Sequence, residues 1–334
     1  MARIGILGGG SWGIALAVLL HKNGHQICVW SALEAEINML REQHEHRMLP
    51  GVVLPEDTVF TTRADQAVEG KDLLVMAVAS SYTRETAARI SGLVQPGQRI
   101  VNVAKGIEEG TLMTLSEIIE QEIPQADVAV LSGPSHAEEV GKGLPTTIVV
   151  GAKTQATAEY IQNLFMSEVF RVYISPDITG IELGGALKNV VALAAGIADG
   201  LGYGDNTKAA LITRGITEIA RLGIAMGGKF ETFCGLTGIG DLIVTCASMH
   251  SRNRRAGILI GQGKSCEEAM AEVKMVVEGV HSARAAMALA RKYDVQLPII
   301  EQVNQVLFEG KSADQAVKDL MLRDKKIEVP AFPW

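Results

Sequence analysis

The stretch RIGILGGGSWG, residues 3–13, decides the fold. It begins with a short apolar run typical of a buried strand and ends in the pattern GxGxxG, and an apolar helix-like stretch follows over residues 14–20. In this strand–turn–helix context, Gly8 permits a tight turn, Gly10 lets a pyrophosphate approach the backbone, and Gly13 lets the helix pack close to the strand. The start of the helix then offers free N–H groups to phosphate, so the stretch predicts a dinucleotide-binding site.

The end of the second predicted strand, residues 26–30, bears on the choice of dinucleotide. NAD sites usually carry an acid there, which binds the ribose 2′-hydroxyl. This chain has Ser31 and Ala32 instead, and Glu34 falls in the following helix, where a solvent-facing acid of the first turn is expected. The predicted cofactor is therefore NADP or NAD. The missing acid slightly favours NADPH, although the strand end has no arginine that could bind a 2′-phosphate.

Two patterns divide the chain. The first half alternates strand-like runs with helix-like stretches, which predicts a doubly wound, mostly parallel α/β sheet of the Rossmann type. The predicted strands cover 3–7, 26–30, 72–78, 99–104, 127–131 and 146–150. Apolar residues at helical spacing dominate the second half, which predicts an all-helical domain. Its predicted helices cover 183–197, 208–226, 265–274, 280–293 and 299–309. We expect a dinucleotide-binding domain over 1–180, a helical substrate-binding and catalytic domain over 181–334, and an irregular tail over 329–334.

Composition excludes several classes of function. The chain has 334 residues, with 31 Lys and Arg against 38 Asp and Glu, giving a net charge of −7. An acidic surface repels nucleic acid, so no nucleic-acid partner is expected. Charged and polar residues such as Lys188 and Asn189 interrupt the apolar stretches, so no membrane insertion is expected, and the N-terminus lacks the pattern of a secretory signal. We expect a cytoplasmic protein. The histidines and cysteines lack metal-ligand spacing, so no metal is predicted.

Lys188 is the strongest candidate for a catalytic group. It interrupts an apolar segment that should form a buried helix, and burying an ammonium without a function is costly. Burial lowers the pKa of a lysine toward neutrality, where it can exchange a proton with a substrate oxygen. A lysine that reaches the surface from a helix end is the alternative interpretation.

Other candidates lie at predicted strand ends and in turns. Lys105 follows the strand at 99–104, and the segment 132–138 follows the next strand, at the sheet edge where α/β proteins bind ligands. Asp241 lies in a glycine-framed turn, where it could equally serve as a turn residue. The run 251–255, SRNRR, suits a phosphate monoester, although a charge run is often only a solvated surface. Glu278 could reach a cofactor ribose or simply end a helix.

Taken together, these motifs resemble the bacterial-type NAD(P)-dependent glycerol-3-phosphate dehydrogenases. Seven blocks match in order along nearly the whole chain: GGGSWG at 8–13, NVAKGIE at 102–108, SGPSHAEE at 132–139, ELGGALKNVVALAAGIADGLG at 182–202, GLTGIGDLIVTC at 235–246, SRNR at 251–254 and VVEG at 276–279. The resemblance implies an oxidoreductase that interconverts dihydroxyacetone phosphate and sn-glycerol 3-phosphate, supplies phospholipid synthesis and is usually a homodimer.

The resemblance also implies roles for individual residues. Lys188 would be the catalytic acid and base. The substrate would be surrounded by Lys105, Gly133, Ser135, Lys188, Asp241, Ser251, Arg252 and Asn253. The cofactor would contact Gly8, Gly10, Ser11, Trp12, Gly13, Lys105, Ala137, Arg252, Val276 and Glu278.

The departures from the family pattern concern mainly the cofactor. The family often has a basic residue after the second strand, where this chain has Ser31 and Ala32, so Arg47 or a later residue would have to bind a 2′-phosphate. Met48 and Ala79 replace a common tyrosine and proline. Two alternatives remain open: a related two-domain 3-hydroxy-acid dehydrogenase, which would need a carboxylate site, and a non-enzymatic NAD(P)H redox sensor, which would need a partner-binding surface.

Overall fold

The computed structural model describes residues 1–325 and 327–328, so the predicted irregular tail at 329–334 lies outside the described residues. Within the described part, one sheet of eight strands has the order β3-β2-β1-β4-β5-β6-β7-β8. The strands are β1 (Arg3–Leu7), β2 (Gln26–Trp30), β3 (Val59–Thr61), β4 (Leu73–Met76), β5 (Arg99–Asn102), β6 (Asp127–Ser132), β7 (Thr146–Ala152) and β8 (Phe170–Ser175). Neighbouring strands are parallel except β6 and β7, which confirms the mostly parallel sheet.

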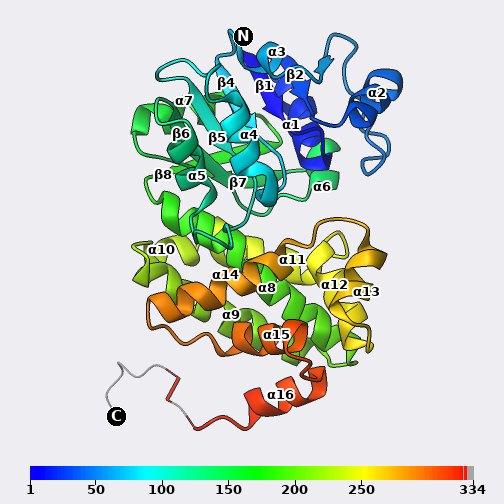
Figure 1. Cartoon of the computed structure of the whole chain (residues 1–334), viewed down its shortest axis with the longest axis vertical. Coiled ribbons are helices and arrows are strands. Elements are labelled where there is room, and N and C mark those ends of the chain that lie inside the picture. Colours follow the sequence, from blue (N-terminus) through cyan, green and yellow to red (C-terminus); the bar gives the residue numbers. More distant parts are fainter. Residues whose placement is uncertain (326, 329–334) are drawn as a thin grey trace.

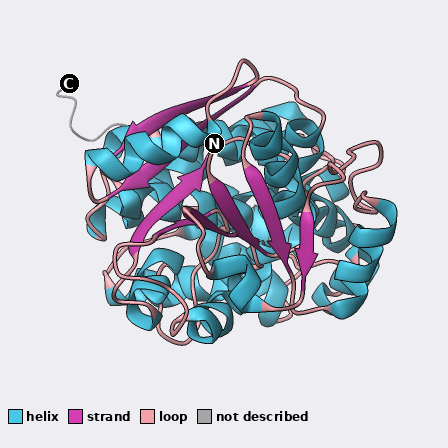
Figure 2. Cartoon of the chain, turned by 90° about the horizontal axis from the view of Figure 1, so that it is seen from above, coloured by secondary structure: helices cyan, strands magenta, loops and turns pink. Residues whose placement is uncertain are grey.

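Helices cover both faces of this sheet (Figure 2). They are α1 (Ser11–Lys22), α2 (Glu34–Gln43), α3 (Ala64–Val68), α4 (Thr83–Ile90), α5 (Leu115–Glu122), α6 (Ala137–Gly141) and α7 (Gln155–Phe165). Strand pairing brings β1 beside β4, the point at which the strand order reverses direction. A crevice at the carboxyl ends of the strands is expected there, and the glycine loop after β1 lies at its edge.

Two strands were missed by the sequence interpretation. β3 has only three residues, too few to show a period. β8 lies at the sheet edge and alternates buried and exposed residues at its start, so it lacks a continuous apolar run. The sheet ends at Ser175, and the helical domain continues from there (Figure 1).

The helical domain is built around α8 (Ile178–Gly200), which contacts α9, α11, α12 and α14. Its other helices are α9 (Asp205–Ala225), α10 (Phe230–Phe233), α11 (Asp241–Ala247), α12 (Arg252–Gly261), α13 (Cys266–Val273), α14 (Glu278–Lys292), α15 (Pro298–Phe308) and α16 (Ala313–Met321), with a π-helical turn over Leu236–Gly240. The predicted all-helical second domain is confirmed. α12 was not predicted because its polar first turn hides the helical period.

Helices α8 and α12 touch backbone to backbone. A Cβ atom added at Gly257 would lie 2.3 Å from the carbonyl oxygen of Leu193, and one added at Gly196 would lie 2.1 Å from that of Arg254. Only glycine permits this approach. The contact holds the first turn of α12, which carries the SRNR motif, at a fixed distance from Lys188 on α8.

Two segments, Ile178–Gly200 and Phe230–Ala247, are long and apolar enough by length and hydropathy to cross a membrane. The sequence expectation that polar residues break every such stretch is therefore too strict. In the first segment all of the tested window is buried inside the protein, so its apolar residues pack in the core, and in the second segment 39% of the window is buried.

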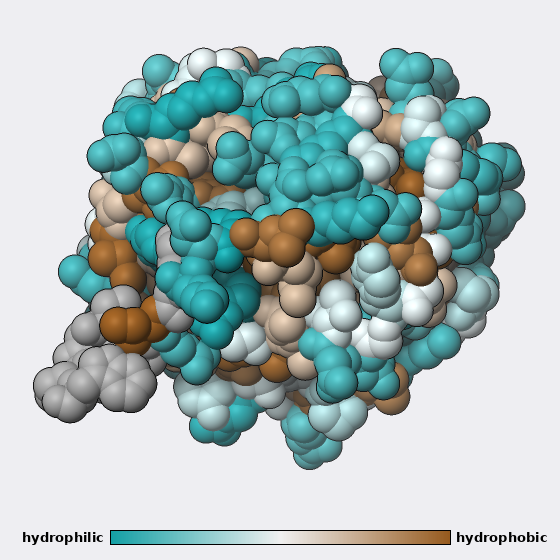
Figure 3. Space-filling view, turned by 90° about the horizontal axis from the view of Figure 1, so that it is seen from below, coloured by the Kyte–Doolittle hydropathy of each residue, from teal (hydrophilic) through white to brown (hydrophobic). Residues whose placement is uncertain are grey.

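Seen from below, the helical domain shows apolar surface in brown among polar side chains (Figure 3). A groove of about 1360 Å³ is lined mainly by α9, α15 and α16.

Candidate active site

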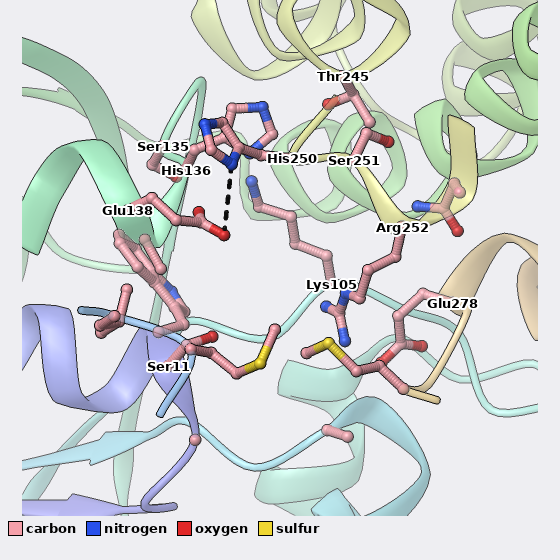
Figure 4. A pocket seen from close by; sticks show the side chains of 18 of the residues that line it. Ser11, Lys105, Ser135, His136, Glu138, Thr245, His250, Ser251, Arg252 and Glu278 are labelled. Atoms are coloured by element: carbon pink, nitrogen blue, oxygen red, sulfur yellow. Dashed lines mark ion pairs between the residues drawn. The ribbon is translucent and has the colours of Figure 1, made fainter. Parts of the chain in front are cut away.

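A cleft of about 560 Å³ lies between the sheet edge and the helical domain. Side chains from both domains point into it, with Ser11 and Lys105 on the sheet side and Ser251 and Arg252 on the helical side (Figure 4). The predicted site residues that line it are Gly10, Ser11, Trp12, Lys105, Ser135, Ala137, Lys188, Ser251, Arg252, Asn253 and Glu278. Residues far apart in the sequence thus form one cavity.

The glycine loop presents an uncapped helix end to this cleft. Gly8 has φ +128°, and a Cβ atom there would lie 2.7 Å from the backbone of Ala77, so this position requires glycine. At Gly10, the N-cap of α1, an added Cβ would meet nothing within 4 Å. The first turn of α1 has no acidic residue and no side-chain cap. Free amides beside open space suit the pyrophosphate of a dinucleotide, so the residues present fit this cofactor.

Lys188 and Lys105 share one buried carboxylate, that of Asp241. Lys188 Nζ donates to Asp241 Oδ1 at 2.6 Å, and Lys105 Nζ donates to Asp241 Oδ2 at 2.7 Å. Lys188 also donates to Thr245 Oγ1 at 2.6 Å, and Lys105 to the carbonyl oxygen of Gly133 at 2.9 Å. An ammonium has three N–H donors, so Lys188 keeps one for a ligand in the cleft that it lines.

Burial and the neighbouring charges together set the pKa values of Lys188 and Asp241. Burial lowers the pKa of Lys188 to about 8; Asp241 opposes this shift, while Lys105 adds to it. Burial alone would raise the pKa of Asp241, but the two ammonium groups outweigh it and hold this pKa below its usual value. The site therefore carries a stable carboxylate beside a lysine that can gain or lose a proton near neutral pH.

The SRNR motif forms the start of α12. Ser251 is the N-cap, and its hydroxyl accepts a hydrogen bond from Arg254 N at 3.2 Å. Asn253 is buried, donating to Asn189 Oδ1 at 2.9 Å and accepting from Gly279 N at 2.8 Å. Arg252 faces the cleft, and burial lowers its pKa while Glu278 and Glu138 oppose the shift. A guanidinium at an N-terminal helix end is suited to a phosphate group.

Glu278 joins the two domains at the rim of the cleft. It begins α14, and its carboxylate accepts hydrogen bonds from both the amide and the hydroxyl of Ser80, which follows β4. A Cβ atom at Gly106 would lie 2.4 Å from Ser80 Cβ. The loops after β4 and β5 and the start of α14 therefore meet at one point, which fixes the width of the cleft.

Some predicted residues lie behind the cleft wall. Gly8 and Gly13 shape the glycine loop, while Gly133 and Asp241 act through the lysines that they bind. Val276 is outside the lining, and its neighbour Met275 is part of it. The cavity is also lined by residues that were not among the predicted site residues, although some lie in the candidate segments 132–138 and 251–255: Met48, His136, Glu138, Lys142, Asn189, Thr245, His250 and Arg255.

Two of the missed residues carry a recognisable signal. Thr245 lies one helical turn after Asp241 on α11, a spacing that places both on one face. His136 follows Ser135 in a quoted motif; burial lowers the pKa of its imidazole, and its ring lies 5.8 Å from that of His250. His250 Nδ1 in turn lies 3.7 Å from Glu138 Oε1 (Figure 4). In the described residues, no group of three or more His, Cys, Asp and Glu side chains is arranged to hold a metal ion.

Comparison with known proteins agrees with this geometry. The family model for the NAD-dependent glycerol-3-phosphate dehydrogenase N-terminus matches residues 3–158, and the model for the C-terminus matches residues 177–318. A glycerol-3-phosphate dehydrogenase (NAD(P)+) of Agathobacter rectalis is 64% identical over 100% of both chains. A protein of the same name from Fusobacterium nucleatum is 59% identical over 99% of this chain and 100% of its own.

A solved structure shows the same architecture. The crystal structure of glycerol-3-phosphate dehydrogenase from Coxiella burnetii superposes with a TM-score of 0.93, at 36% identity, over 96% of this chain and 99% of that one. The resemblance of the sequence motifs is thus confirmed along the whole length. The chain belongs to the NAD(P)-dependent glycerol-3-phosphate dehydrogenase family.

Proposed function

We propose that this protein interconverts dihydroxyacetone phosphate and sn-glycerol 3-phosphate by hydride transfer at C2, with Lys188 as proton donor and acceptor. The observation that carries the proposal is the Lys188–Asp241–Lys105 cluster, which lies beside the glycine loop and Arg252 in one cleft. The cluster supplies a proton and the loop suits a dinucleotide, while Arg252 suits a phosphate. A 3-hydroxy-acid dehydrogenase would have no use for a phosphate site.

The charged side chains in the cleft have different proposed roles. Arg252, together with Ser251 and Asn253, binds the substrate phosphate and fixes which end of the substrate enters. Lys188 donates its remaining N–H to the C2 oxygen and transfers the proton as negative charge develops there. Lys105 is placed to orient the substrate, and Asp241 holds both ammonium groups. The nicotinamide cofactor, when bound, supplies or accepts the hydride.

The pKa of Lys188 predicts opposite pH dependences for the two directions. Reduction needs the protonated lysine, so its kcat/KM should fall as pH rises through about 8. Oxidation of glycerol 3-phosphate needs the neutral lysine, so its kcat/KM should rise over the same interval and then level off. Initial rates in both directions between pH 6 and 10 test this. Profiles that bend in the same direction would show that Lys188 is not the shared acid and base.

Removing Arg252 should weaken substrate binding far more than the chemical step. A charged hydrogen bond contributes roughly 1.5–3 kcal/mol, so Arg252→Ala should raise KM for dihydroxyacetone phosphate about 10- to 100-fold. Arg254→Gln is the matched control, because Arg254 lies on the same helix but donates to Asp199 Oδ2 at 2.8 Å and to the carbonyl of Ala247. An unchanged KM for Arg252→Ala would exclude its role in holding the phosphate.

A substrate panel tests the proposed activity. The absorbance of reduced cofactor at 340 nm should fall with dihydroxyacetone phosphate, and only slowly with dihydroxyacetone or with a 3-oxo acid, because these lack the phosphate that Arg252 would bind. NADH and NADPH are run in parallel. Faster turnover of the 3-oxo acid would favour the hydroxy-acid alternative. A protein that binds reduced cofactor but oxidises it with none of the three would favour the redox sensor.

The wider role rests on the family resemblance. We propose that the enzyme is cytoplasmic, supplies glycerol 3-phosphate for phospholipid synthesis, and neither inserts into membranes nor binds nucleic acid. We also propose a boundary between the domains at about residue 180, in the first turn of α8. A homodimer is proposed as well; light scattering of the purified protein should give twice the chain mass of 35.6 kDa, and the mass of a single chain would exclude it.

A further inference from the structure

A carboxylate from α2 lies against the glycine loop. A Cβ atom added at Gly9 would lie 2.8 Å from Glu36 Oε2 and 3.3 Å from Glu36 Cγ, so the side chain of Glu36 covers the middle glycine. Glu36 belongs to the first turn of α2, just after the end of β2, and is half-buried. Its carboxylate therefore lies beside the glycine loop, near which NAD sites usually carry an acid from the end of the second strand, although here the acid comes from the next helix.

Among the described residues, the polar side chains around this turn form no hydrogen bond or ion pair with the Glu36 carboxylate. Ser31 is buried, and its hydroxyl accepts a hydrogen bond from Leu33 N at 3.1 Å. Arg41 donates to the carbonyl oxygen of Phe60 at 3.0 Å, and Arg63 pairs with Asp65. The nearby His46 is buried, and burial lowers its pKa, an effect that Glu36 partly opposes.

A free ribose and a 2′-phosphate respond oppositely to such a carboxylate. The ribose hydroxyls donate hydrogen bonds to it, whereas a phosphate presents only like charge and acceptor oxygens. We propose that Glu36 selects NAD over NADP by accepting hydrogen bonds from the ribose hydroxyls and repelling a 2′-phosphate. This rests on the proposed function, in which the glycine loop binds the dinucleotide. The proposed preference for NAD is the opposite of the preference for NADPH that the residues at the end of β2 predict by themselves.

Binding of nucleotide fragments tests this independently of turnover. ADP-ribose and 2′-phospho-ADP-ribose lack nicotinamide, and calorimetry gives their Kd values directly. The wild-type protein should bind ADP-ribose at least about tenfold more tightly, equivalent to about 1.4 kcal/mol. Glu36→Gln should shrink this ratio several-fold, chiefly by improving the binding of the phosphorylated fragment. Glu34→Gln is the matched control, because Glu34 lies in the same turn but is exposed, and the ratio should not change.

A third variant tests the competing role of Arg47, which is exposed and follows His46 in the chain. Arg47→Gln should leave the ratio unchanged; a selective loss of 2′-phospho-ADP-ribose binding would show that Arg47 recognises a phosphate and would overturn the inference. A ratio that Glu36→Gln does not alter, with both fragments bound, would overturn the role of Glu36 but leave the proposed function intact. If a folded wild-type protein bound neither fragment, the dinucleotide site itself would be wrong.

Discussion

Lys188→Ala should lower kcat for the reduction of dihydroxyacetone phosphate by about 10²- to 10⁴-fold, the usual contribution of a positioned general acid. The amine lies in the buried middle of α8, and its two protein partners leave a single N–H for the substrate oxygen. Lys105 Nζ donates to the carbonyl oxygen of Gly133 and to the other oxygen of Asp241, and it lies on the sheet side of the cleft, where its proposed role is to orient the substrate. Steady-state rates at saturating substrate give the change in kcat.

Lys188→Met is the shape-preserving control, since methionine fills most of the space without an ammonium. Both variants should bind reduced cofactor with nearly wild-type affinity, measured by fluorescence titration, because Lys188 is not part of the glycine loop. A variant that kept more than about a tenth of the wild-type kcat would contradict the assignment of Lys188 as proton donor.

Asp241→Asn should have the second large effect, on both stability and pH dependence. It removes the carboxylate that two ammonium groups share in a buried site, and breaking such an arrangement costs about 3–5 kcal/mol in unfolding free energy at pH 7. Asp241 raises the pKa of Lys188, so its loss should move the bend in the pH profile of kcat/KM to lower pH. Urea denaturation and initial rates measure the two effects.

Asp199→Asn separates positioning from general destabilisation. Asp199 pairs with Lys208 and Arg254 away from the lysine cluster, so this variant should lose stability and keep the wild-type pH profile. If the pH profile of kcat/KM for Asp241→Asn bent at the same pH as the wild-type profile, Asp241 would be a structural residue only and would not influence the pKa of Lys188.

The sheet and the glycine loop could be predicted because their signals are local. RIGILGGGSWG contains a strand, a turn and a helix start in adjacent residues, and the apolar period of α8 made Lys188 conspicuous. Motif resemblance then supplied roles for Asp241 and for the start of α12. The short edge strand β3 and the polar start of α12 gave no comparable pattern.

The parts that could not be predicted depend on distant contacts. No spacing in the sequence indicates that Lys105 and Lys188 would share one carboxylate, because the two lysines come from different domains. The sequence also does not indicate that Glu36 lies over Gly9, because an acid in a first helical turn normally faces solvent. The lysine cluster depends on how the loop after β5 meets the helical domain, and the Glu36 contact depends on how α2 packs against the loop after β1.

The central claim is hydride transfer to C2 of dihydroxyacetone phosphate within this cleft. Reduced cofactor carrying deuterium at the transferable position of its nicotinamide ring tests it directly, with the product examined by proton NMR and mass spectrometry. The account predicts one deuterium at C2 of glycerol 3-phosphate from the wild-type protein, and almost none in the same time from Lys188→Ala. Product without deuterium, or deuterium at another carbon, would contradict it.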